Sequence, residues 1–63
     1  MSKDSLEILE IEISNAEQAL LNLETELMEE HPSYETLKKL ADEVVDRGKR
    51  IRKAIKRDRK HFT

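Results

Sequence analysis

The sequence predicts an all-α fold, a two-helix antiparallel hairpin that is coiled-coil-like and dimerises into a four-helix bundle. Apolar residues recur at alternating steps of three and four in both halves of the chain, the spacing that keeps one stripe of a helix facing a partner. The stripe comprises Leu9, Ile13, Ala16, Leu20, Leu23 and Leu27 in the first half and Leu37, Ala41, Val44, Gly48, Ile51 and Ile55 in the second. Each residue of the first half has a counterpart in the second, and the two residue numbers add to 64. The centre of this mirror is Pro32, the only proline, so the stripes face each other if the chain reverses there.

The first helix is expected over residues of about 5–30. Asp4 followed by Glu7 has the spacing of a capping box, and acidic residues crowd the first turns, where the helix dipole favours them. The turn is expected at about 31–33, because a proline disfavours helix at the preceding residue, here His31. Ser33 is a suitable N-cap for a second helix over about 34–60, followed by a frayed tail at 61–63. Residues 1–63 then form a single helical-hairpin domain.

One alternative to the hairpin stays open at this point. The heptad spacing continues through the centre by way of Glu30 and Tyr34, so a single straight helix in an antiparallel dimer would make the same pairs between two chains. Pro32 opposes that arrangement, because a proline inside a helix costs about 3 kcal/mol and a dimer would contain two. The hairpin is therefore favoured over a swapped dimer of straight helices.

Charge divides the chain into two opposite halves. Residues 1–30 carry a net charge of −8, residues 31–63 carry +6, and the segment 47–60 alone carries +8. A hairpin sets the acidic start beside the basic end, with Glu10 opposite Arg52 and Glu24 opposite Lys38 on one flank. Exposed pairs of this kind contribute about 0.2–1 kcal/mol each, so they select the orientation of the helices more than they stabilise it.

The chain is too short to bury a large core, and it has no cysteine for a disulfide. Helix one is apolar on more than one side, which a solitary hairpin does not need. We expect a protein interface that extends beyond the stripe. Its residues are Ile8, Ile11, Leu21, Met28, Leu40 and Val45. A homodimer is the favoured partner, with a hetero-partner protein as the alternative. The small pair Ala16 and Gly48 marks either a close approach or notch, or a tolerated weak point.

The basic segment predicts a second, different function. Residues 49–60 present outward bases suited to phosphate contact, namely Lys49, Arg50, Lys53, Lys56, Arg57 and Lys60. No helix-turn-helix signature, zinc spacing or interleaved aromatic residues accompany them, so nucleic acid is a possible partner but is not favoured.

Catalysis has little support in this sequence. It contains no cysteine nucleophile, glycine-rich phosphate loop or serine elbow, and its two histidines are 30 residues apart. We expect no enzyme activity, no cofactor, no metal site and no membrane span, and a cytoplasmic location. The function predicted is that of a small regulatory or adaptor protein, of the kind encoded by phages, plasmids or bacterial operons. It would act by helix-mediated protein–protein interaction and self-association, and the sequence does not identify its target.

Overall fold

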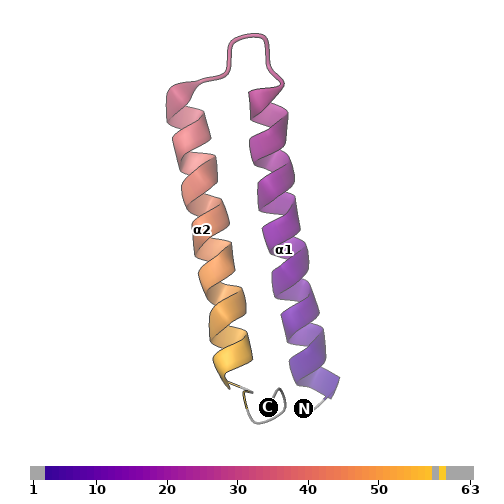
Figure 1. Ribbon diagram of the computed structural model, residues 1–63. Helices are drawn as coiled ribbons and strands as arrows, with labels where there is room; N and C mark the ends of the chain where they lie inside the picture. Colours follow the sequence, from indigo (N-terminus) through magenta and orange to yellow (C-terminus); the bar gives the residue numbers. More distant parts are fainter. Residues whose placement is uncertain (1–2, 58, 60–63) are drawn as a thin grey trace.

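The computed structural model describes residues 3–57 and residue 59, and it is a hairpin of two helices. Helix α1 spans Lys3–Leu27 and helix α2 spans Tyr34–Arg57, and no strand occurs in the described part of the chain. The helices run antiparallel side by side, with the turn at one end (Figure 1). The prediction of an all-α antiparallel hairpin is confirmed, and a single straight helix through Pro32 is excluded.

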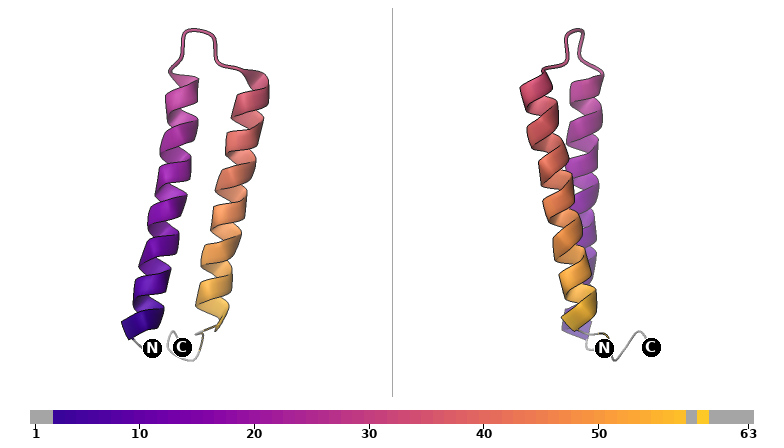
Figure 2. Two further views of the ribbon diagram at one scale, coloured as in Figure 1. Left: turned by 180° about the vertical axis from the view of Figure 1, so that it is seen from behind. Right: turned by 60° about the vertical axis from the view of Figure 1, so that its left-hand side comes forward.

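The hairpin is elongated. Its Cα radius of gyration is 14.6 Å and its principal extents are 46 × 15 × 15 Å, whereas a compact domain of this length would have a radius of gyration of about 11 Å. The two further views in Figure 2 show the helices remaining adjacent from the turn to the open end. The molecule is thus a single layer two helices wide, and one helix pair has to supply all the burial.

Helix α1 ends three residues earlier than the sequence suggested. The amide of Met28 donates to the carbonyls of Glu24 (3.1 Å) and Thr25 (3.2 Å), and the amide of Glu29 donates to the carbonyl of Glu26 (3.1 Å). Bonds to the third residue back tighten the last turn and satisfy carbonyls that a helix end leaves free. The chain has therefore left the helix before it reaches Pro32.

The start of α2 is capped from both helices. The Ser33 hydroxyl accepts a hydrogen bond from the amide of Thr36 (3.3 Å), as expected of an N-cap. In a full capping box the third helical residue is Glu or Gln and returns a bond to the cap amide, but here that residue is Thr36. Glu26 of α1 takes this role, since its carboxylate accepts from the Ser33 amide at 2.9 Å. The cap thus joins the two helices at the turn. Asp4, which was expected to cap α1, lies within that helix, because α1 begins at Lys3.

Packing between the helices differs from the predicted interface. The only buried apolar residues in the described part are Ala19 (3% exposed) and Ala54 (6% exposed), and neither belongs to the predicted stripe. Half of the predicted stripe is half-buried between the helices, namely Leu9, Ala16, Leu23, Leu37, Val44 and Ile51. The other half is exposed, namely Ile13, Leu20, Leu27, Ala41, Gly48 and Ile55. The predicted interface is therefore wrong at half of its positions.

In the contact between the helices, the exposed half of the predicted stripe is replaced by the residues one position earlier in the sequence. These are Glu12, Ala19 and Glu26 on α1 and Leu40, Arg47 and Ala54 on α2, all buried or half-buried. Counterparts across the hairpin now have numbers that add to 63, so each helix has turned about its own axis relative to the predicted pairing. Ala19 and Ala54 are the most buried residues of this interface, and their small side chains let the two backbones approach closely at those positions.

Two of the three charged residues brought into the interface, Glu26 and Arg47, have a hydrogen-bond or ion-pair partner. The carboxylate of Glu26 forms the cap at Ser33. The guanidinium of Arg47 binds Glu43 on its own helix at 3.1 Å, while its aliphatic stem covers apolar surface, as long basic side chains commonly do. These bonds reduce the cost of placing polar residues beside Ala19 and Ala54.

Candidate interaction surface

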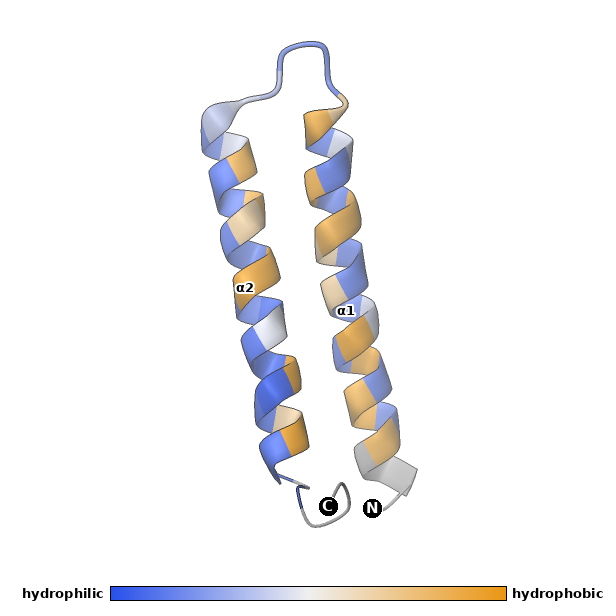
Figure 3. Ribbon diagram, in the orientation of Figure 1, coloured by the Kyte–Doolittle hydropathy of each residue, from blue (hydrophilic) through white to orange (hydrophobic). Residues whose placement is uncertain are grey.

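Two lines of residues spaced by seven lie on one side of the hairpin, and we call them the open face. On α1 they are Leu6, Ile13, Leu20 and Leu27, and on α2 they are Tyr34, Ala41, Gly48 and Ile55, all exposed. Seven residues are nearly two helical turns, so each line runs straight along its helix. In an antiparallel pair these equivalent positions lie on the same side, opposite the side closed by Ala19 and Ala54. Figure 3 shows apolar segments recurring along both helices, more densely on α1.

The open face contains large apolar side chains that a hairpin of this size would be expected to bury. Leu20 is 47% exposed, Leu27 is 58% exposed and Tyr34 is 73% exposed. No side chain in the described part is completely buried. The apolar burial achieved within the hairpin is thus small, and a chain of this length rarely folds stably on so little. The surface that could supply more burial is the open face.

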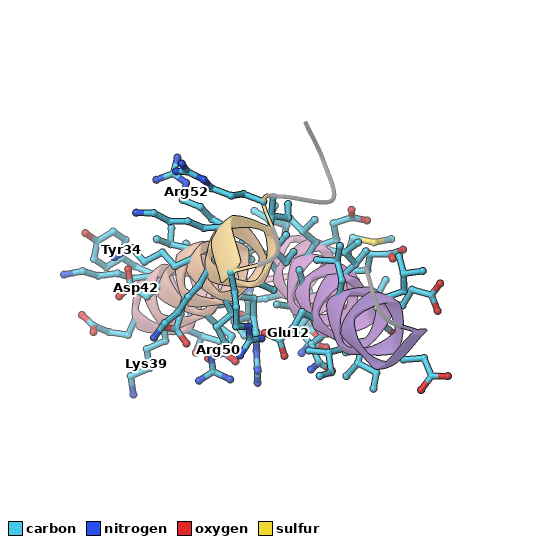
Figure 4. The ribbon with its side chains drawn as sticks, turned by 90° about the horizontal axis from the view of Figure 1, so that it is seen from below. Glu12, Tyr34, Lys39, Asp42, Arg50 and Arg52 are labelled. Carbon is cyan, nitrogen blue, oxygen red and sulfur yellow. The ribbon has the colours of Figure 1, made fainter. Side chains whose placement is uncertain are left out.

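Charged residues border the open face with opposite sign on the two helices. Four residues after every open-face residue except the last one on each helix lies Glu10, Glu17 or Glu24 on α1 and Lys38, Val45 or Arg52 on α2. All six are exposed. We call these residues the acidic rim and the basic rim, with Val45 as the one apolar member. Arg52 projects on the side of the hairpin opposite Glu12 and Arg50 (Figure 4).

The rims are not paired within the hairpin. The two ion pairs among the described residues are both internal to α2, Arg47–Glu43 at 3.1 Å and Arg50–Asp46 at 3.4 Å. The pairs expected from the sequence, Glu10 with Arg52 and Glu24 with Lys38, are therefore not made. The rotation that buried Ala19 and Ala54 also turned both rims towards the open side, which leaves their charges available to another molecule.

A shallow hollow lies on the α1 side of the open face. It has a volume of about 450 Å³, and Leu20, Leu21, Glu17 and Glu24 are among its lining residues. Its lining is thus partly apolar and partly acidic, with Ser14 and Gln18 as the other lining residues. An apolar side chain with basic neighbours would complement it.

The residues predicted from sequence as a protein interface are divided among several sides of the hairpin. Val45 borders the open face, and Leu21 and Met28, which is 85% exposed, lie beside it on α1. Ile11 is also exposed, and Ile8 lies on the closed side. Leu40 is half-buried between the two helices.

Sequence reasoning missed Ile13, Leu20, Leu27 and Ile55 as surface residues, because they belong to the regular three-four stripe that it assigned to the contact within the hairpin. The alanines at equivalent positions of both helices, Ala19 and Ala54, were the signal for the other choice.

The basic end of α2 forms a second feature on the closed side. Four cations line a hollow of about 490 Å³ together with Glu12 and the apolar Ile8 and Ala54; the cations are Arg50, Lys53, Lys56 and Arg57. Arg50 projects to the same side as Glu12 (Figure 4). Lys49 is exposed elsewhere on the helix, and Lys60 lies outside the described residues. The structure thus brings four of the six predicted nucleic-acid contacts to one place.

Two kinds of site are not found in the part of the chain that the structure describes. Neither α1 nor α2 is long and apolar enough to span a bilayer. No three histidine, aspartate or glutamate side chains of residues 3–57 and 59 gather into a group that could hold a metal ion.

Comparison with known proteins finds no matching family model, no matching curated protein and no matching solved structure.

Proposed function

We propose that this chain is a small non-enzymatic regulatory or adaptor protein that acts by helix-mediated protein–protein interaction and self-association. The open face is its binding surface. The observation that carries the proposal is the contrast between two buried alanines inside the hairpin and large apolar side chains exposed in a straight line along α1, with Tyr34 and Ile55 exposed at the two ends of the matching line on α2.

An uncovered hairpin leaves the apolar side chains of the open face in contact with water. Burying apolar surface contributes about 25 cal/mol per Å² removed from water. Large contiguous apolar patches on small proteins mark surfaces that bind other molecules. A helix pair can bury such a patch by packing a second helix pair against it, which produces a four-helix bundle. A partner that brings two further helices would bury Ile13, Leu20 and Leu27 together.

The test is a single substitution at the centre of the open face, Leu20→Glu. A carboxylate there removes apolar burial and has to be desolvated when a partner binds, so binding should weaken by at least about tenfold. The matched control is Ile11→Glu, because Ile11 is also an exposed aliphatic residue of α1 but lies outside the open face. Sedimentation velocity over a range of concentrations measures the mass in solution of both variants.

We expect the wild type and Ile11→Glu to show the mass of a dimer, twice the 7.4 kDa of one chain, and Leu20→Glu to show the mass of a monomer. Helical circular dichroism confirms that each variant still folds at the concentrations compared. A dimer that persists in Leu20→Glu and dissociates in Ile11→Glu would contradict the assignment of the open face as the binding surface.

Nucleic-acid binding is a second candidate function, favoured by the four cations around the hollow at the basic end of α2. Phosphate contacts release counterions, so affinity for a short RNA or DNA duplex should fall steeply with salt. The variant Lys53→Glu/Arg57→Glu should abolish binding measured by fluorescence anisotropy. The control Lys38→Glu/Lys39→Glu makes the same charge change near the turn and should bind far better. Equal binding by both variants would contradict this candidate.

A further inference from the structure

We infer that the molecule covering the open face is a second copy of this chain, with α1 of each copy packed on α2 of the other. This inference rests on the proposed function and specifies its partner. It is drawn from the length of the open face, the charges of its two rims and the hollow beside Leu20.

The length of the open face sets the kind of occupant. Its lines of apolar residues extend over 6–27 on α1 and 34–55 on α2, most of each helix in a molecule 46 Å long. A short peptide or a loop would cover only part of it. An occupant that covers all of it presents two parallel lines of apolar residues of the same length and spacing. The open face of a second copy has those dimensions.

The rims decide which helices meet. The acidic rim of α1 carries Glu10, Glu17 and Glu24, and the basic rim of α2 carries Lys38 and Arg52. If α1 packed on α1 of the partner, acidic rims would lie against each other, and the two basic rims would do the same. If α1 packs on the partner's α2, both contacts bring opposite charges together. Complementary charges at such flanking positions commonly set partner choice and orientation in helix bundles.

The hollow on α1 supports the same arrangement. Its lining includes the apolar Leu20 and Leu21 and the acidic Glu17 and Glu24. Val45 is the apolar member of the basic rim, 57% exposed, with a cation seven residues before and after it. The partner's Val45 therefore brings an apolar side chain to the leucines of the hollow, and the cations on either side of it lie near the glutamates. An α1 helix offers only glutamates at these rim positions and makes no such match.

Charge reversal tests the arrangement directly. One variant, Glu10→Lys/Glu24→Lys, makes the rim of α1 basic, and a second, Lys38→Glu/Arg52→Glu, makes the rim of α2 acidic. Each alone sets like charges together in both contacts of a dimer, so its dissociation constant should rise by about tenfold or more. Mixed in equal amounts, the two variants have opposite charges at both contacts, and they should form a heterodimer with the affinity of the wild type.

The control variant is Lys39→Glu/Lys53→Glu, which reverses two charges of α2 at exposed positions that are two and five residues away from open-face positions. It should dimerise like the wild type.

At ~1 M salt the screening length is about 3 Å, so all the variants should then have the same dissociation constant. A variant that had simply lost its fold would not recover in salt.

Three results overturn the inference. The first is dimerisation of each rim variant with the affinity of the wild type. The second is a mixture of the two that stays monomeric. Dissociation of the dimer by Leu20→Glu alongside either result would refute the arrangement while leaving self-association through the open face intact. The third is a wild type that remains monomeric at every concentration, which would refute self-association as well.

Discussion

Replacement of Gly48 by alanine should stabilise the hairpin, and this follows from where the two helices do and do not touch. Gly48 lies inside α2, and a Cβ atom added there would meet nothing within 4 Å. Glycine in a helix interior is less favourable than alanine by about 1 kcal/mol, because it loses more backbone freedom on folding. With no contact to compress, that whole difference should appear in the free energy of unfolding.

The assay is thermal and urea unfolding followed by helical circular dichroism. A gain of about 1 kcal/mol corresponds to a rise in Tm of about 4–8 °C for a domain near this size. The measurement belongs in the Leu20→Glu background, where the hairpin is expected to be monomeric, so that approach of a second copy to Gly48 does not enter the result. The control is Ala41→Gly, the reverse change at another exposed position on the same line of α2. Its free energy of unfolding should fall by about as much as that of Gly48→Ala rises.

The result that would refute the reasoning is a loss of stability in Gly48→Ala. In the pairing predicted from the sequence, Gly48 faced Ala16 inside the hairpin, and a methyl group there would be compressed between the helices. A destabilised Gly48→Ala variant would show that the helices close on the side of Gly48, and the open face as defined above would then be the interior.

Three further predictions concern the closed side, the cap and the ion pairs of α2. Ala54→Leu should destabilise the hairpin by about 1–3 kcal/mol, because it overfills a buried position between the helices, while Ala41→Leu on the open face should have no such effect in urea unfolding of the monomeric Leu20→Glu background. Ser33→Ala should cost about 1 kcal/mol in the same assay through loss of the N-cap, and Glu26→Ala should also destabilise, since the Ser33 amide loses its acceptor. Asp46→Asn should change stability by less than about 0.5 kcal/mol, because both partners of its ion pair are more than half exposed; a larger loss would show that the pair belongs to a buried network.

The sequence predicts the reversal of the chain and its helices well. Pro32 is incompatible with a continuing helix, Ser33 is a strong cap, and the three-four spacing of apolar residues is maintained on both sides of them. These are local effects of covalent structure and of helix geometry, so they do not depend on how the helices meet. The cap completed by Glu26 is the exception, because it depends on the approach of α1 to Ser33.

The side on which the hairpin closes could not be predicted in the same way. Each helix carries apolar residues over a broad arc, and two adjacent stripes share Leu9, Ala16 and Leu23 on α1. The choice between them depends on how near the two backbones can come, a property of both helices together. Ala19 and Ala54 are smaller than Leu20 and Ile55, but the observed stripe also has Leu40 and Arg47 where the predicted stripe has Ala41 and Gly48, so side-chain size at single positions does not decide between the stripes.

The same difficulty affected the candidate site. The sequence pattern assigned Ile13, Leu20 and Leu27 to the interior of the hairpin. The predicted protein interface was therefore limited to the other apolar residues of α1, which lie on several sides of the helix. The charge pattern was less informative, since the pairs expected to select orientation, Glu10 with Arg52 and Glu24 with Lys38, are not made within the hairpin. Whether that pairing occurs within a chain or between chains depends on the rotation of each helix, which the residue spacing leaves undetermined.

The most direct test of the open face is an NMR measurement of contacts between copies, on an equal mixture of isotope-labelled and unlabelled chains. Filtered nuclear Overhauser spectra of that mixture report only proximity between molecules. We expect contacts to the partner from the methyl groups of Ile13 and Leu20, and none from those of Ala19 and Ala54. Contacts from Ala19 and Ala54, with none from Leu20, would contradict the account.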